Sequence, residues 1–341
     1  MNETPAKVNF ESISQKESFP IIEEPPYAND MDDDVENLVP QQLGEKSSPN
    51  THFPNAPPAL PTSIALTYNA TKPPKETLQA VYRAGQYKAG LPLNLLMVQS
   101  TMAGVYIAMA GHLFIAVGGG IIGAAVFPTG LIAVVLTSAE LFTGDALVFV
   151  ASVLGGKVSF GKLLRNWSVS WIMNFAGCLL WAALLAYASN SLEDLGKADL
   201  AVKIALKKAN QPWGHIFIKG IGANFMVCVG VWQATCAEEV AGKILALWFP
   251  ISAFVMMGFD HVVANQFLIP VGMMYGADIS ISHLLFRALL PASLGNLVGG
   301  GLFVGAVYWY VYDSMTGDKK FLARIKDGWS NARRGNVPKD E

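Results

Sequence analysis

Six long apolar segments constrain this chain more than any other feature of its sequence. A helix that crosses the hydrocarbon core of a bilayer needs roughly 20 apolar residues in a row, and the chain supplies that length six times after residue 90. Its residues are 52% hydrophobic and 15% charged, whereas about a quarter of the residues in soluble domains are charged. We therefore expect an all-α integral membrane protein with six transmembrane helices. The expected segments are Leu91–Val117, Ile121–Leu154, Trp167–Ala188, Gly214–Thr235, Lys243–Gly276 and Ala288–Tyr312.

The second and fifth segments are too long for a single crossing, and each contains polar residues near its middle. The second segment includes the run Glu140–Asp145, and the fifth includes Asp260 and His261, followed by Asn265 and Pro270. Irregular backbone at membrane depth is tolerated only where protein or a water-filled cavity satisfies its polar groups. These two segments are therefore predicted to be broken helices that line a pathway.

The distribution of lysine and arginine predicts which side of the membrane each loop occupies. Basic residues precede the first segment, separate the second from the third and follow the sixth. With six crossings these three places lie on one side, so both termini are expected in the cytoplasm and the protein in the plasma membrane. Residues 190–212 belong to the opposite side but contain four lysines, which is an exception to the pattern.

The two ends of the chain differ in charge from the apolar body. Residues 1–60 contain eleven acidic and three basic residues together with several prolines, a composition that does not bury enough apolar surface to fold. We expect a disordered acidic cytoplasmic tail over residues 1–85, with an amphipathic lead-in over residues 74–90. A transmembrane domain over residues 86–315 and a basic cytoplasmic tail over residues 316–341 complete the expected organisation.

The cysteines and the basic residues exclude several other classes of site. Cys178, Cys228 and Cys236 lie in apolar segments without a CxxC pair, which supports neither a disulfide framework nor a cysteine metal site. The basic residues flank apolar segments and do not line one face, as they do in nucleic-acid-binding proteins. We therefore expect no metal, cofactor, nucleic acid partner or catalytic residue.

A weak internal repeat supports a pathway through the protein. The run Asn174–Gly177 in the third segment matches Asn296–Gly299 in the sixth at an offset of 122 residues. Ala103-Gly104 and Gly222-Ala223 lie 119 residues apart in the first and fourth segments. A three-crossing unit used twice is inverted in its second copy, because an odd number of crossings reverses direction. Inverted repeats whose broken helices meet near the midplane are typical of transporters and channels.

Motifs in five of the six segments make the sequence resemble a known family. They are Glu140-Leu-Phe-Thr-Gly144, Asn166-Trp167 with Asn174, Lys219-Gly-Ile-Gly-Ala-Asn224, Gly258-Phe-Asp-His261 continuing to Pro270, and Gly295–Gly301. In this order, over roughly residues 85–315, they resemble the formate/nitrite transporter family. The resemblance implies an aquaporin-like fold and a homopentamer with one pore in each protomer. It also implies permeation of small monovalent weak-acid anions such as formate, nitrite or a related short carboxylate.

The resemblance also assigns the residues of the pathway. The family's central histidine matches His261, and the threonine that faces it from the broken second helix matches Thr143. The lysine at the outer entrance matches Lys219, and a nearby asparagine matches Asn224. Asn265 follows the histidine in the broken fifth helix. Many members have glutamate before the histidine, whereas this chain has Asp260, whose shorter side chain puts its role in orienting the imidazole in doubt.

Three apolar residues match the family's constrictions. The resemblance implies that Phe127 and Leu131 narrow the pathway on one side and that Phe254 narrows it on the other. Such side chains would exclude water and inorganic cations from the centre.

The central histidine has a chemical reason to be there. A bare anion at the centre of a bilayer is costly, and desolvation drives a weak acid toward its neutral form. His261 can offer a hydrogen bond to the anion or a proton that travels with it, because histidine titrates near neutral pH. Thr143 adds a hydroxyl donor, and the free N–H groups at each half-helix start add partial positive charge. We expect anion binding to be coupled to proton uptake.

Three other functions fit part of the sequence. An aquaporin-like channel for water or glycerol would share the fold, but such channels have Asn-Pro-Ala motifs at both half-helix starts, and the apolar body has none. A membrane-embedded enzyme could use Asp260 and His261 as an acid/base pair, although a metal hydrolase would need three converging ligands. A structural membrane protein would not need two broken helices. The neutral-solute channel is the main alternative to anion transport.

Overall fold

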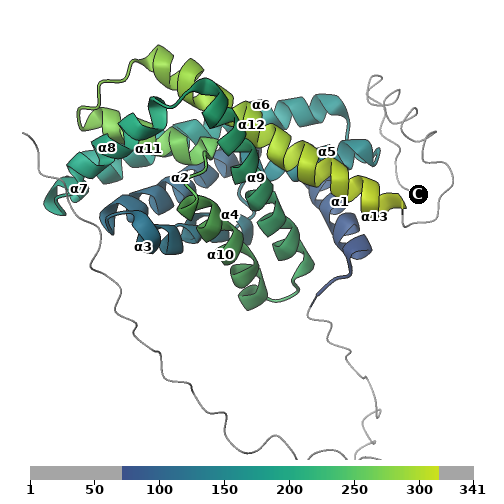
Figure 1. The fold of residues 1–341 in the computed structure, drawn as a ribbon. Helices are drawn as coiled ribbons and strands as arrows, with labels where there is room; N and C mark the ends of the chain where they lie inside the picture. The colour runs from purple at the N-terminus through teal and green to yellow at the C-terminus, as the bar shows by residue number, and fades with distance from the viewer. Residues whose placement is uncertain (1–70, 315–341) are drawn as a thin grey trace, which may run out of the picture. The chain divides into compact units, whose positions relative to one another are not determined.

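The computed structural model describes residues 71–314 of the chain. The expected acidic tail up to residue 70 and the expected basic tail over residues 316–341 lie outside the described residues. Within residues 71–314 the regular structure is helical, and strand-like pairing is confined to an isolated bridge between Thr71 and Ala237. Figure 1 shows these helices packed side by side.

Four helices are long and apolar enough to cross a membrane. They are α2 (Leu93–Ala116), α6 (Phe160–Trp181) with η1 (Ala182–Tyr187), α9 (Trp213–Cys236), and a continuous run of η2 (His283–Leu289), α12 (Leu290–Leu297), η3 (Val298–Ala306) and α13 (Val307–Ser314). The third and sixth helices start earlier than expected, at Phe160 and His283, because an apolar run marks the bilayer core. A helix continues beyond that core into the interface, where polar side chains reach water.

The expected second and fifth helices are both broken. Helices α3 (Gly120–Val126), α4 (Pro128–Leu136) and α5 (Phe142–Leu154) make up the second, and α10 (Val240–Met256) and α11 (Val262–Met274) make up the fifth. Each break contains a residue in the left-handed region, Ser138 with φ 56° and Gly258 with φ 69°. A residue with positive φ ends a helix sharply, so the second half starts in a new direction.

Short helices flank the bundle at two ends. Helix α1 (Pro74–Gly90) packs on α5 and α13, and α8 (Ala198–Ala209) packs on α11. Figure 1 shows α1, α5 and α13 together at one end, with α8, α11 and the short α7 (Ser191–Asp194) at the other. Residues 190–212, which the charge pattern assigns to a loop, therefore form α7 and α8. We use "α1 side" and "α8 side" for the two ends of the protein.

Two buried asparagines hold the two breaks in the same way. Asn174 Oδ1 accepts from the N–H of Phe142 (3.0 Å), and its Nδ2 donates to the carbonyls of Ser100 and Glu140. Asn296 Oδ1 accepts from the N–H of Val262 (2.8 Å), and its Nδ2 donates to the carbonyls of Gly220 and Asp260. The partners of the two asparagines lie 120 residues apart in each case. The tertiary structure therefore carries the internal repeat, with an offset of 120 in place of the 119 that the first and fourth segments predict.

Small residues bring the long helices close together. A Cβ on Gly177 would lie 2.1 Å from the carbonyl oxygen of Thr101, and a Cβ on Gly299 would lie 2.1 Å from that of Ile221. Helices in lipid gain little from the hydrophobic effect between them, so close packing at small residues drives their association. Gly177 and Gly299 occupy equivalent contacts, α2 with α6 and α9 with η3.

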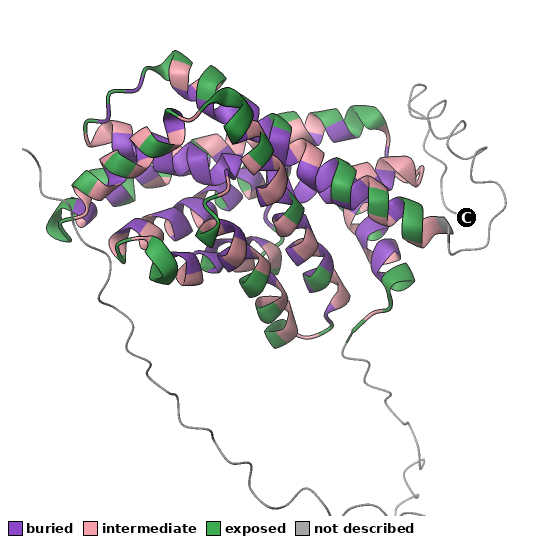
Figure 2. Cartoon of the chain, viewed as in Figure 1, coloured by how far each residue is buried: buried purple, intermediate pink, exposed green. Residues whose placement is uncertain are grey.

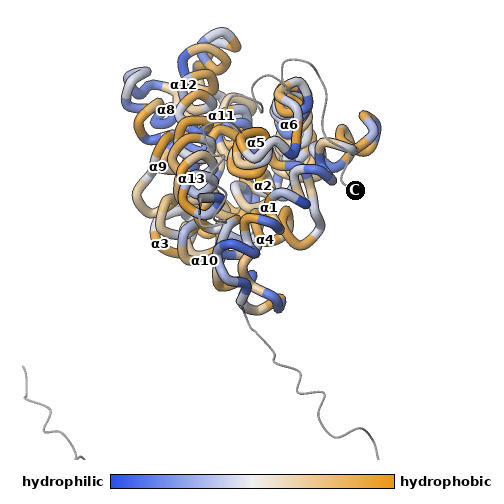
Figure 3. The backbone as a smooth tube through the Cα atoms, turned by 90° about the vertical axis from the view of Figure 1, so that its right-hand side faces the viewer, coloured by the Kyte–Doolittle hydropathy of each residue, from blue (hydrophilic) through white to orange (hydrophobic). Residues whose placement is uncertain are grey.

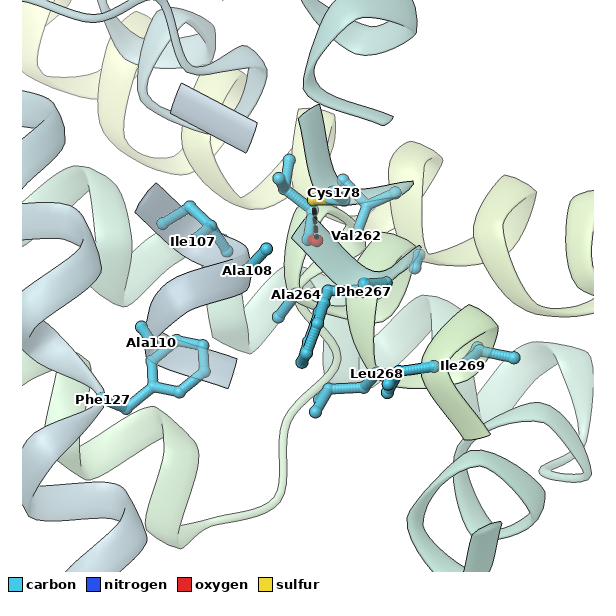
Figure 4. Packing of buried hydrophobic residues seen from close by; sticks show 14 of the residues in the cluster. Ile107, Ala108, Ala110, Phe127, Cys178, Val262, Ala264, Phe267, Leu268 and Ile269 are labelled. Carbon is cyan, nitrogen blue, oxygen red and sulfur yellow. Dashed lines mark hydrogen bonds between the residues drawn. The ribbon is translucent and has the colours of Figure 1, made fainter. Parts of the chain in front are cut away.

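Burial in the bundle is arranged as expected for a membrane protein. Buried residues gather in the interior, whereas large apolar side chains are exposed on the outside (Figure 2), including Ile121 at 75% and Phe249 at 72%. Hydrophobic residues predominate along most helices, and hydrophilic stretches concentrate at helix ends and connecting segments (Figure 3). Figure 4 shows the core around α11, where the thiol of Cys178 donates to the carbonyl of Val263 (3.5 Å).

Candidate functional site

The two broken helices meet at a contact between Thr143 and His261. Thr143 lies in the first turn of α5 and His261 at the N-cap of α11, and both side chains are buried. Thr143 Oγ1 lies 2.9 Å from His261 Nε2. The first N–H groups of a helix lack intrahelical acceptors and carry partial positive charge. Two such ends therefore converge on one point in the interior.

The hydrogen bonds of His261 indicate which ring nitrogen carries the proton. The N–H of Ala264 donates to His261 Nδ1 (3.0 Å), so this nitrogen is an acceptor. In a neutral imidazole the other nitrogen then carries the hydrogen, and Nε2 donates to Thr143 Oγ1. We assign this tautomer from the hydrogen-bond network. The hydrogen of the Thr143 hydroxyl is left to donate to a third group.

Two phenylalanines lie beside the histidine. The rings of Phe127 and Phe254 meet edge to face with centroids 6.3 Å apart, and Phe254 stacks on His261 at 5.9 Å. The sequence assigns Phe127 and Phe254 to opposite sides, whereas the structure brings them into contact on the α8 side of His261. This is because α4 packs against α10. Leu131 lies one turn after Phe127 in α4 and is also buried.

A cavity of about 470 Å³ leads from α8 to His261. Phe127, Phe254 and His261 form its inner part, and apolar side chains of α3, α8 and α10 form much of its wall. The polar side chains among its lining residues, apart from His261, are Lys207, Lys208, Gln211, Lys219 and Asn265. An anion that enters this cavity meets lysine first and the buried imidazole last.

A hydrogen-bonded network surrounds Asp260 at the start of α11. Asp260 Oδ1 accepts from Lys208 Nζ (2.9 Å) and Asn265 Nδ2 (3.2 Å), and its Oδ2 accepts from Gln211 Nε2 (3.3 Å). The carboxylate is fully buried and has a cation beside it, as a buried charge requires. Asp260 therefore fixes the break in the chain next to His261 and makes no printed contact with the imidazole itself.

A second charged network occupies the equivalent place on the α1 side. Lys88 Nζ lies 2.5 Å from Glu140 Oε1 and 3.0 Å from Asp145 Oδ1, and Asn166 Nδ2 donates to Glu140 Oε2 (2.9 Å). Burial lowers the pKa of the Lys88 ammonium, but Asp145 and Glu140 outweigh it, so the pKa of Lys88 lies above its ordinary value. Lys88 is therefore charged at neutral pH.

Two more residues from the sequence prediction lie near the site. Asn224 is buried, and its Nδ2 donates to the carbonyls of Thr143 (3.1 Å) and Asn296 (2.7 Å). It therefore positions the start of α5. Lys219 lies at the cavity, where its ammonium donates to Gln211 Oε1.

Sequence reasoning missed Lys88, Lys208 and Gln211 as parts of the site. The repeat contained the signal for the two lysines, since Lys88 and Lys208 lie 120 residues apart, as do Glu140 and Asp260. The lysines precede the first and fourth apolar segments, in stretches that look like ordinary flanking residues until the chain is folded.

A family model described as "Formate/nitrite transporter" matches residues 75–310 of the chain. The chain belongs to this family. A protein of Methanothermobacter thermautotrophicus named "Probable formate transporter" is 36% identical over 267 residues, which cover 71% of this chain and 97% of that protein.

Two solved structures support the same family. One titled "FNT family ion channel" has a TM-score of 0.63 and 27% identity, and the match covers 70% of this chain and 98% of the other. One titled "Pentameric formate channel with formate bound" has a TM-score of 0.57 and 30% identity, covering 64% and 97%. The resemblance and the all-helical, aquaporin-like fold class are thus confirmed. The protein is an integral membrane protein that transports small anions, and it is not an enzyme.

Proposed function

We propose that each protomer of a homopentamer conducts a small monovalent weak-acid anion, formate or nitrite, past Thr143 and His261. The observation that carries the proposal is the convergence of two half-helix starts on the Thr143–His261 contact (2.9 Å). Support for the anion and for the pentamer comes from the solved relative whose title names a pentamer with bound formate. The substrate is a related short carboxylate if formate and nitrite both fail.

The convergence of helix starts lowers the cost of a partly desolvated anion. Each helix N-terminus carries roughly half a positive charge, and free N–H groups bind anions there. The hydroxyl of Thr143 adds a donor, because its oxygen is already an acceptor for His261. Phe127 and Phe254 exclude water at this level, which strengthens each of these interactions. Lys219, Asn224, Asn265 and Asp260 line or position the remainder of the pathway, and Leu131 narrows it.

We further propose that a proton assists the anion through His261. An arriving anion stabilises imidazolium, which forms when Nδ1 takes up a proton and releases the N–H of Ala264. Nε2 then passes its proton to Thr143 Oγ1 while the Thr143 hydroxyl gives its own proton to the anion. The products are the neutral acid and an imidazole protonated at Nδ1. The lost bond to Ala264 makes the charged state short-lived and returns the ring to its starting tautomer.

The placement in the cell follows from the charge pattern. We propose a transmembrane domain over residues 86–315 in the plasma membrane, with both termini in the cytoplasm. The α1 side then faces the cytoplasm, and the cavity on the α8 side faces outward.

The test uses the full chain in liposomes. Radiolabelled formate and nitrite fluxes are measured at two pH values with the internal pH recorded, and glycerol-driven swelling is measured in parallel. We expect formate or nitrite flux accompanied by alkalinisation of the compartment that loses the acid, and no glycerol permeation. The variant His261→Gln should reduce flux at least about tenfold, because a buried hydrogen bond to a charged group contributes about 1.5–3 kcal/mol.

A matched control separates chemistry from general damage. His215 is exposed and lies outside the lining of the cavity, so His215→Gln should keep wild-type flux. Wild-type flux in His261→Gln would refute the role of the histidine. Glycerol swelling without anion flux would favour the neutral-solute channel. A mass for the detergent-solubilised protein other than that of five chains would refute the pentamer.

A further inference from the structure

The repeat allows the two sides of the pathway to be compared residue by residue. Lys88 with Glu140 on the α1 side corresponds to Lys208 with Asp260 on the α8 side, each residue displaced by 120. The carbonyls bound by Asn174 and Asn296 have the same displacement. A position on one side therefore has a defined counterpart on the other, and a difference between counterparts is a departure from symmetry.

Lys219 is the clearest departure from this symmetry. Its counterpart is Gln99, a neutral residue, and the counterpart of its hydrogen-bond partner Gln211 is Leu91, which is apolar. A lysine and an amide on the α8 side thus replace an amide and a leucine on the α1 side. Asn265 likewise replaces the acidic Asp145. All three differences make the α8 side more favourable for an anion.

The charges around the cavity on the α8 side are unbalanced. Lys207, Lys208 and Lys219 all line it, and Lys208 has the carboxylate of Asp260 as its partner. For Lys207 and Lys219 the described residues supply no carboxylate within salt-bridge distance. On the α1 side, Lys88 contacts two carboxylates, and the guanidinium of Arg165 donates to the carbonyl of Leu91 (2.7 Å).

Lys219 is held so that its charge stays available to a ligand. Its ammonium donates to Gln211 Oε1, and Gln211 Nε2 donates to Asp260 Oδ2 (3.3 Å) and to the carbonyl of Lys208 (3.4 Å). An ammonium has three hydrogens, and an amide oxygen does not neutralise it. Gln211 therefore fixes the direction of Lys219, and the remaining hydrogens can bind an anion.

We propose that Lys219, oriented by Gln211 and assisted by Lys207, forms an outer binding site for one small monovalent anion on the α8 side. The site precedes the contact between Thr143 and His261, and the α1 side lacks it because Gln99 stands in place of Lys219. Transport is therefore asymmetric, with a lower half-saturating concentration for entry from the α8 side. This proposal rests on the proposed function, since it names a second site on the same pathway.

An outer site of this kind serves conduction. Binding must be favourable enough for entry but weak enough for release, and a second ion at an adjacent site promotes release by repulsion. An exposed lysine attracts anions without holding them tightly, because its charge remains partly hydrated. The expected consequence is a change in half-saturating concentration with little change in maximal flux.

The test compares formate entry from the two sides of reconstituted full-length protein. A protease-removable tag at the N-terminus reports the orientation in each liposome. In the wild type we expect the half-saturating formate concentration to be about three- to tenfold lower for entry from the α8 side. The variant Lys219→Gln installs the residue of the counterpart position and should remove this difference by raising the value on the α8 side. Lys219→Arg should keep the difference.

The control variant is Lys203→Gln, which removes the same charge from the exposed face of α8, outside the cavity lining. It should leave the wild-type asymmetry unchanged. Equal half-saturating concentrations from the two sides in the wild type, or unaltered asymmetry in Lys219→Gln, would overturn the proposal. So would a fall in maximal flux in Lys219→Gln with no change in half-saturating concentration, because the lysine would then act at the centre.

A binding measurement separates this proposal from the proposed function. Sodium formate should raise the unfolding temperature of the solubilised wild type more than sodium gluconate at equal ionic strength, and the difference should shrink in Lys219→Gln. A wild type that gains stability from formate in this Lys219-dependent way but conducts no anion would refute the proposed function and keep the outer site. Conduction with no Lys219-dependent stabilisation would do the reverse.

Discussion

His261 is fixed at both ring nitrogens by groups from different parts of the chain. Ala264 donates to Nδ1 from within the same half-helix, and Thr143 accepts from Nε2 across the break. The imidazole is thus also the N-cap of α11, where its acceptor nitrogen satisfies one of the free N–H groups. A protonated ring would lose this bond and place its charge at the positive end of a helix. The resting state is therefore neutral, and an anion is needed to stabilise the charged state.

This arrangement makes Thr143 the sensitive partner. In Thr143→Val, Nε2 loses its acceptor and the pathway loses a hydroxyl donor, and an unsatisfied buried group costs about 1–3 kcal/mol. Formate flux should fall roughly 10- to 100-fold, whereas Thr143→Ser should retain most of it. Initial rates in liposomes measure the effect. Equal flux in the valine and serine variants would show that the hydroxyl has no role.

At the scale of the elements, the long helices depend on close backbone contact. Gly177 and Gly299 face carbonyl oxygens of neighbouring helices at distances that leave no room for a methyl group. Gly161 lies in the same helix as Gly177, but nothing lies within 4 Å of its Cβ position. The two glycines of α6 therefore separate the packing effect of a methyl group from its effect on helix propensity.

We expect opposite results at these two positions of α6. Gly177→Ala should push α2 and α6 apart and lower the yield and unfolding temperature of the detergent-solubilised protein, because the blocking atoms belong to the backbone of Thr101. Gly161→Ala should be neutral or stabilise by about 0.5–1 kcal/mol, since glycine is a poor helix former. Thermal unfolding monitored by circular dichroism compares them, and similar losses in both variants would contradict the packing explanation.

At the scale of the whole molecule, Lys88 joins the lead-in helix to the transmembrane bundle. Leu78, Val81 and Tyr82 of α1 pack against the bundle, and Lys88 reaches Glu140 and Asp145 at the break before α5. The position of α1 and the geometry of the pathway are thus linked through one buried ion group. The raised pKa of Lys88 means that its stabilising contribution is complete below pH about 10 and is lost as the pH rises through the folded-state value.

Removing this lysine should have a pH-dependent cost. Lys88→Met leaves two buried carboxylates without their cation and should destabilise the fold by about 3–5 kcal/mol near neutral pH. The deficit should shrink in acid, because protonation of the carboxylates removes the uncompensated charge. Unfolding temperatures at pH 5 and pH 8 measure the change, with the exposed Lys75→Met on the same helix as the control. A deficit that does not depend on pH would show that Lys88 acts through packing alone.

The local patterns of the sequence predicted some features better than others. The two breaks were predictable, because polar runs such as Glu140–Asp145 are costly within an apolar segment. The ends of the third and sixth helices were not, since helices extend beyond the apolar runs. The contact between Phe127 and Phe254 was also not predictable, because it depends on how α4 and α10 pack. The roles assigned to the site residues stay predictions until the experiments above are done.

The sequence by itself determined that this chain lies in a membrane, where its helices break and which family it belongs to, because apolar length and polar interruption are local properties of the chain. Only the tertiary structure decided which charges pair across the breaks. Lys88 with Glu140 and Lys208 with Asp260 are each separated by 52 residues, and no pattern within one helix contains both partners. Such groups meet only when the helices pack, because burial then requires every charge and N–H group to find a partner.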